Sequence, residues 1–429
     1  LIGIDSSFVP IYFEIASENE PPIVPYAFPF IGHTIDYFTN TENFIKKCHK
    51  QYGEIFSLYV FGKTITIVGK ETSREVIKTL LLGRSYNFFD EIAKVIREEL
   101  SNDMRQYTTR IQDAAKKSID KYIGDCKTQK CIKLFQQMIQ QIVAIPVVSV
   151  IVGEDLSNDD ELVNTFAHLT QDIASALSLP PFLNFIHPSL HTNFFVFRMK
   201  HTNHPYKKHK QVIIDRIIRI IKEREHKKKE LGSTWKPPAD ILQLFINVST
   251  KDGLVDVKKV ADCLIDIIFA AMHTTSNAIS NVLYEYGGRP EYWKELFEEN
   301  QKISLEIKDG YLTSKDINNM IKLDSFIRET LKYWNAIGRN VLMYITEIQG
   351  TDSKTSTFDG FNTLKKILEL QRQIKNPGRF FALHIIKIIL YLLIEKYKIV
   401  TENGTIVKPV FAGSFLIPNS EGIILENRK

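Results

Sequence analysis

Helical spacing of apolar residues dominates the middle of the chain and limits what the chain can fold into. Between Glu71 and about Trp334, apolar residues recur at intervals of three and four, which is the period of an amphipathic helix. Breaks rich in proline or glycine interrupt this pattern at Leu177 to Phe182, Ser233 to Asp240 and Gly287 to Pro290. The sequence therefore predicts a large body made of several helices.

Strand patterns lie at the two ends of this body. Residues 54–69, "EIFSLYVFGKTITIVG", predict two strands around a Phe-Gly-Lys turn, because β-branched and aromatic residues predominate there. A proline-rich segment that cannot be helical, residues 21–33, and a short helix over residues 41–52 precede them. Near the C-terminus, Asn403-Gly404 between apolar runs predicts an end rich in hairpins. The expected fold class is mainly α with small β-sheets.

The longest apolar run, Leu383 to Ile394, has 12 residues and contains Lys387. This length favours a buried core helix over a membrane span, which needs about 20 apolar residues. No Walker loop is present and no GxGxxG follows a strand, so nothing indicates nucleotide binding. The densest basic run, residues 226–230, fits the solvated end of a charged helix better than a nucleic-acid patch.

Four cysteines are scattered without CxxC pairs or zinc spacing, and they are typical of ordinary thiols in a reducing compartment. They are Cys48, Cys126, Cys131 and Cys263. We expect neither a structural disulfide nor a metal site built from cysteines.

Several segments, in the same order along the chain, resemble the cytochrome P-450 family. Residues 21–33, "PPIVPYAFPFIGH", are similar to the hinge that follows the family's membrane anchor. "FAAMHTTS" at 269–276 resembles the helix that crosses the distal face of the haem, and "FIRETLKYWNAIGRN" at 326–340 resembles the helix with a Glu-x-x-Arg motif. "NPGRFFALHIIKIILYLLIEKYKI" at 376–399 resembles the haem-proximal helix. The "HTTS" and "GRFFA" motifs are most similar to fungal members.

The resemblance implies catalytic roles for Thr274 and Thr275, because a threonine at this position helps to deliver protons in the family. The alternative from the residues alone is that both hydroxyls bond back to the preceding helical turn. His273 stands where many relatives carry an acid, and we interpret it as structural. Glu329 and Lys332 would form the Glu-x-x-Arg motif, with lysine replacing the planar arginine fork.

The resemblance places Asn376, Arg379 and Arg97 at the cofactor: Arg379 in the Pro-Gly-Arg segment and Arg97 on the helix that contacts a haem propionate. The alternative for Arg97 is a solvated surface arginine. In the family, the residue before Pro-Gly-Arg is the cysteine that holds the iron, but this chain has Asn376. A neutral amide cannot supply the electron push of a thiolate. The preceding residues 362–375 predict an amphipathic helix where the family has a glycine-rich loop.

Two other possible ligands are badly placed. Cys263 lies 11 residues before Thr274, or about 16 Å along one helix. His384 lies eight residues beyond Asn376, or about 12 Å along the proximal helix. The sequence therefore offers no replacement for the missing thiolate.

The resemblance implies a single P-450-type domain over residues 21–429, after a lead-in of residues 1–20 from which the anchor is missing. The implied function is a haem-dependent monooxygenase that hydroxylates a terpenoid, sterol or fatty acid. Electrons would come from NADPH through a reductase at the cytosolic face of the endoplasmic reticulum membrane, with peripheral membrane association and no nucleic acid. The alternatives are a non-catalytic remnant or mis-spliced gene model, and a lipophile-binding protein without redox chemistry.

Overall fold

The computed structural model describes residues 21–68, 104–177, 182–187, 190–202, 204–251, 254–307, 309–334, 341–343, 379–412, 415–417 and 419–428. The helices are α1 (Thr34–Thr39), α2 (Thr41–Tyr52), α5 (Arg105–Tyr122), α6 (Phe135–Ile151), α7 (Asp160–Leu177), α8 (Leu190–His201), α9 (Pro205–Leu231), α10 (Ile241–Ser249), α11 (Val257–Gly287), α12 (Trp293–Glu306), α13 (Ser314–Asn319), α14 (Ile321–Trp334) and α17 (Arg379–Lys396). The strands are β1 (Ile55–Val60), β2 (Lys63–Val68), β3 (Lys130–Ile132), β4 (Thr250–Lys251), β5 (Leu254–Val255), β6 (Val341–Met343), β7 (Tyr397–Thr401), β8 (Val410–Ala412), β9 (Phe415–Ile417) and β10 (Ile423–Asn427).

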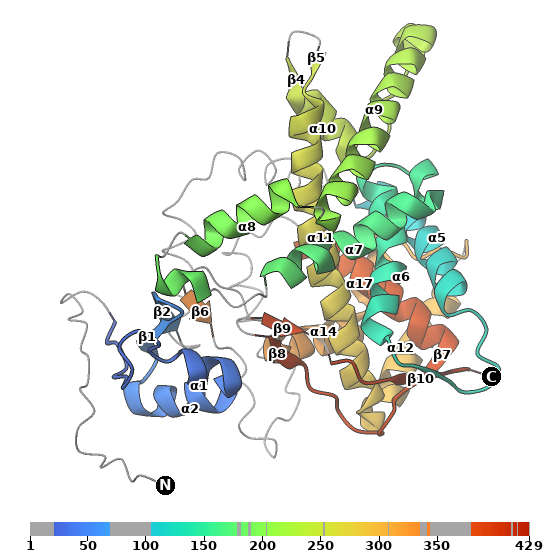
Figure 1. The fold of residues 1–429 in the computed structure, drawn as a ribbon. Coiled ribbons are helices and arrows are strands. Elements are labelled where there is room, and N and C mark those ends of the chain that lie inside the picture. The colour runs from blue at the N-terminus through green and yellow to red at the C-terminus, as the bar shows by residue number, and fades with distance from the viewer. Residues whose placement is uncertain are drawn as a thin grey trace.

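Helix α11 is the centre of the helical body. It has 31 residues and contacts α6, α7, α9, α10, α14 and α17 along its length (Figure 1). Asp256 caps its first turn by accepting a hydrogen bond from the Lys259 amide. Buried side chains occupy most of its circumference beyond Ala278, as expected for a helix surrounded by other helices. The prediction that the Phe269 to Ser276 helix runs through the centre of the body is confirmed.

The predicted core helix at Leu383 to Ile394 is also confirmed, within α17. Ile388, Ile389 and Leu390 are fully buried, and the helix packs against α5, α11 and α12. It has apolar residues on nearly all sides because it lies between other helices rather than on the surface. This packing places the start of α17, which carries the Pro-Gly-Arg segment's arginine, beside the helical body.

The N-terminal strands form the expected hairpin. β1 pairs antiparallel with β2 from Ile55–Val68 to Val60–Lys63, and β6 adds to β2 in parallel. The turn between β1 and β2 has positive φ at both Phe61 and Gly62. A Cβ on Gly62 would lie 2.5 Å from the Asn184 carbonyl oxygen, so only glycine fits there.

The C-terminal prediction of hairpins is confirmed only in part. β8 and β9 form a hairpin, but the strand before Asn403-Gly404, β7, pairs with the distant β10 instead of with the segment that follows the turn. β10 in turn pairs with β3, which comes from the first third of the chain. Long-range pairing of this kind depends on tertiary packing that the local turn signal does not contain.

Other predictions fall on residues that the structure does not describe. These are the lead-in over residues 1–20 and the amphipathic helix over residues 362–375. The predicted breaks are confirmed where they are described, since α7 ends at Leu177 and α11 ends at Gly287.

A buried ion pair joins α17 to α14. Lys387 is 4% exposed, and its Nζ lies 2.8 Å from Oδ1 of Asp324. The same ammonium donates a hydrogen bond to the Ile317 carbonyl, and Arg328 Nε lies 2.5 Å from the other Asp324 oxygen. Burial alone would raise the pKa of Asp324, but Arg328 and Lys387 hold it below its usual range. The pair therefore links α17 to α14, two helices that both pack against α11 and α12.

His384 forms a second polar contact between α17 and its neighbours. Its Nε2 lies 3.0 Å from the hydroxyl of Thr108 on α5, and that hydroxyl lies 3.3 Å from the Ser314 hydroxyl on α13. Burial lowers the pKa of His384 from 6.5 to about 4, and the charge of Lys387 adds to this effect. The imidazole is therefore neutral at physiological pH.

We predict that Lys387→Met lowers the free energy of unfolding by about 3 kcal/mol, because it leaves part of the buried Asp324 charge uncompensated. Urea denaturation followed by circular dichroism measures this change. Lys294→Met is the control: Lys294 is 84% exposed beside Glu298, and its loss should cost less than about 0.5 kcal/mol. Equal effects of the two substitutions would contradict a structural role for the buried pair.

We predict that His384→Gln flattens the pH dependence of stability between pH 6.5 and 4. The folded pKa of His384 is the lower one, so the unfolded chain takes up the proton first as the pH falls. The contribution of His384 to the free energy of unfolding is therefore largest above pH 6.5, and it falls by roughly 3 kcal/mol as the pH drops to 4. His226→Gln, at a side chain that is 72% exposed, should follow the wild-type profile. An unchanged profile for His384→Gln would show that the buried imidazole does not titrate in this window.

Candidate functional site

The candidate site begins on the middle of α11, where Thr274 and Thr275 are adjacent but differ in environment. Thr274 is exposed, and its hydroxyl donates a hydrogen bond of 2.7 Å to the Ala270 carbonyl. Thr275 is 2% exposed and belongs to the core. The bond back to the preceding turn, one of the two predicted alternatives, is thus present for Thr274. Its oxygen still has lone pairs that can accept a hydrogen bond from a ligand beside the helix.

His273 is held by protein contacts, as expected for a structural histidine. Its Nε2 lies 3.2 Å from the Asn277 amide, which in turn accepts a hydrogen bond from Gln136 on α6. The ring also stacks on Phe269 with 6.5 Å between centroids. Burial lowers the pKa of His273, so the imidazole is neutral. Hydrogen bonds therefore connect Gln136 on α6 through Asn277 to His273, the residue before Thr274 on α11.

The motif residues Glu329 and Lys332 lie on α14, which packs against α11. They are one turn apart and so lie on the same side of the helix. Glu329 is half-buried. The structure thus brings the helix that carries this motif next to the helix that carries the threonines.

Only one of the three predicted cofactor residues is in the described part of the chain. Arg379 is the first residue of α17. Asn376 and Arg97 lie outside the described residues, and their roles remain predictions. The helix α17 nevertheless packs against α11, which is the arrangement that the family resemblance requires of the proximal and distal helices.

None of the four cysteines lies where a thiolate could replace the missing iron ligand. Cys48 is buried among the apolar residues of the N-terminal sheet, and burial raises its pKa to about 11. Cys126 is buried beside Asn427 at the C-terminal sheet, and burial raises its pKa as well. Cys131 is exposed on β3, and Cys263 is buried on α11, well before Thr274. Each thiol thus belongs to another part of the fold, and the described donors do not fit haem-thiolate ligation.

The described residues also contain no group of three or more His, Cys, Asp or Glu side chains that could hold a metal ion. The polar contacts that sequence reasoning missed are those of Lys387 and His384. A lysine within an apolar run was the available signal, because a buried charge requires a partner. That the partner is Asp324 could not be predicted from the sequence pattern.

Comparison with known proteins places this geometry in a family. The sequence model of the family Cytochrome P450 matches residues 81–350. The cytochrome P450 monooxygenase paxP of Penicillium paxilli is 23% identical over 65% of this chain and 61% of its own length. The lanosterol 14-alpha demethylase of Mycosarcoma maydis is 24% identical over 73% of this chain and 60% of its own length. The chain thus spans about 60% of the length of these curated relatives.

The fold agrees with this match. The solved structure of retinoic acid-bound cyanobacterial CYP120A1 superimposes with a TM-score of 0.67 over 95% of this chain and 99% of that chain. At 14% identity, this likeness shows the fold alone. The predicted fold class, mainly α with small β-sheets in the P-450 arrangement, is confirmed. The chain belongs to the cytochrome P450 family, whose members carry a haem cofactor.

Proposed function

We propose that this protein is by descent a monooxygenase for a lipophilic substrate, such as a sterol, terpenoid or fatty acid, and that oxygen insertion is impaired in this chain. The family match over residues 81–350 supports the first part, together with relatives named as lanosterol demethylase and secondary-metabolite monooxygenase. Electrons would come from NADPH through a reductase, as in the family. The chemistry that the haem supplies in the family is oxygen activation on an iron held by a thiolate.

One observation carries the second part: no cysteine precedes Pro-Gly-Arg at the start of α17, and the existing thiols lie in other parts of the fold. Asn376 offers only a neutral amide. Thr274, which we propose faces the substrate, is exposed midway along α11, and its hydroxyl donates to the Ala270 carbonyl. The chain therefore keeps the body of the family and the distal helix while it lacks the residue that gives the iron its reactivity.

We predict that the purified protein, reduced and exposed to carbon monoxide, shows no thiolate-type Soret band. Asn376→Cys alone should recover little of it, because the glycine-rich loop that orients the sulfur is also missing. Replacing residues 362–376 with a family-like glycine loop that ends in cysteine should recover more. The absorption spectrum of the reduced carbon monoxide complex measures each step. A strong thiolate band from the unmodified chain would mean that one of its four cysteines reaches the iron.

We further propose peripheral membrane association at the cytosolic face of the endoplasmic reticulum. Among the described residues, no helix is long and apolar enough to span a membrane. Several of the exposed large apolar side chains lie on or just before α1 and on the short helix at Phe182–Phe185. Figure 1 shows α1, β1 and β2 on the same side of the molecule. Phe30 is 77% exposed and Phe182 is 60% exposed, and Phe61 contacts both Phe38 and Phe182 edge-on. Aromatic side chains of this kind favour a membrane interface.

We predict that the double variant Phe30→Ser/Phe182→Ser binds phosphatidylcholine vesicles at least about tenfold more weakly than the wild type. Each lost phenylalanine removes about 1.5–3 kcal/mol of the free energy gained when an apolar side chain is buried in the membrane interface. Co-sedimentation with vesicles measures the bound fraction. Leu305→Ser, which removes an 87% exposed apolar side chain on α12, should bind like the wild type. Equal losses for both variants would argue against a defined membrane-facing side.

A further inference from the structure

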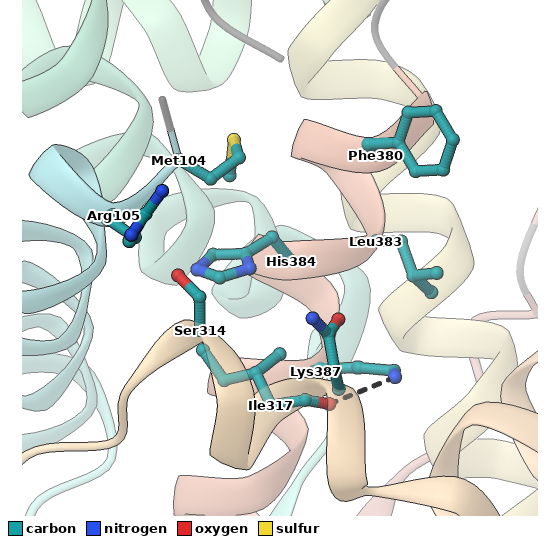
Figure 2. Close-up of a pocket in the computed structure, with 9 residues that line it drawn as sticks. Met104, Arg105, Ser314, Ile317, Phe380, Leu383, His384 and Lys387 are labelled. Carbon is teal, nitrogen blue, oxygen red and sulfur yellow. Dashed lines mark hydrogen bonds between the residues drawn. The ribbon is translucent and has the colours of Figure 1, made fainter. Parts of the chain in front are cut away.

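A cleft of about 280 Å³ lies between the first turn of α5, helix α13 and the first three turns of α17 (Figure 2). None of its lining residues comes from α11, so it is separate from the side of the fold that carries Thr274. Its described lining residues are Met104, Arg105, Ser314, Ile317, Asn318, Phe380, Leu383, His384 and Lys387.

The polar part of the lining favours an anion. Arg105 is exposed and forms no ion pair within the described part of the chain, while no Asp or Glu is among the lining residues. The ammonium of Lys387, the other cation in the lining, is already paired with Asp324, which is not a lining residue. Ser314 and Asn318 add neutral hydrogen-bond donors. The guanidinium of Arg105 is the group with unused donors, and its planar fork matches a carboxylate.

The other part of the lining is apolar. Met104 and Leu383 are half-buried, and Phe380, a residue that is 55% exposed, lies across the cleft from Arg105 (Figure 2). Neutral His384 lies between the two parts, with its Nε2 committed to Thr108. A cationic fork beside apolar side chains suits a ligand that has both a carboxylate and a short hydrocarbon chain.

We propose that this cleft binds a small amphipathic monocarboxylate. The carboxylate pairs with Arg105, with Ser314 and Asn318 as neutral donors, and the hydrocarbon chain lies against Phe380 and Leu383. The volume of about 280 Å³ is large enough for a chain of several carbons. The cleft lies on α17, the helix that resembles the family's haem-proximal helix, but its lining includes none of the residues to which we assign a catalytic or cofactor role.

Methyl NMR of protein labelled at its six methionines tests this proposal, with hexanoate as the probe. Met104 lines the cleft, whereas Met272 is buried on α11 and reports on the other side of the body. Hexanoate should shift the Met104 signal saturably and leave Met272 unchanged. Hexanol and inorganic phosphate should each bind at least about tenfold more weakly, since each lacks one half of the recognised chemistry.

Arg105→Gln should raise the Kd for hexanoate about tenfold, the effect of losing one charge-assisted contact. Phe380→Ala should weaken hexanoate more than acetate, because only hexanoate reaches the ring. Arg219→Gln, at an exposed arginine on α9, is the matched control and should leave the Kd unchanged. Absence of a saturable Met104 shift, an unchanged Kd in a folded Arg105→Gln protein, or equally tight binding of phosphate would each overturn the proposal. So would a hexanoate-dependent shift confined to Met272.

Discussion

The packing of the helical body around α11 is the constraint on which the rest of the structure depends. Because α11 is covered by α6, α7, α9, α10, α14 and α17, its position determines where each of these helices can lie. It also determines the site, since Thr274 and His273 lie midway along it and α14 and α17 pack on it directly. The contacts of α11 are made mainly by apolar side chains, and the ion pair of Lys387 with Asp324 links two of the helices that surround it, α17 and α14.

The sequence predicts those features that depend on local pattern. The core helix α17 follows from an apolar run too short for a membrane, and the hairpin of β1 and β2 follows from alternating β-branched residues around Phe-Gly-Lys. The pairing of β7 with β10 was not predictable, because partner choice in a sheet depends on which strands the packed helices bring together. The ion pair of Lys387 with Asp324 was missed for the same reason: its two residues are far apart in sequence and meet only after α14 and α17 both pack against α11 and α12.

The candidate site divides in the same way. Its helices are where the family resemblance predicts them, and Thr274 has the back-bonded hydroxyl that was one of two alternatives. Asn376 and Arg97 lie outside the described residues, so their roles at the cofactor stay predictions. The absence of a cysteine at position 376 is evident from the sequence, whereas the burial of Cys48, Cys126 and Cys263 in other parts of the fold required the structure. The family's fold is therefore present in this chain, whereas loss of the family's iron-binding thiolate is our proposal.

Iron K-edge X-ray absorption of the protein reconstituted with haem tests the central claim, that this chain keeps the P450 body without a thiolate for the iron. The account predicts that the iron's first shell consists of nitrogen and oxygen neighbours without a sulfur neighbour. A well-defined sulfur neighbour in the unmodified chain would contradict it, because it would place one of Cys48, Cys126, Cys131 or Cys263 at the iron.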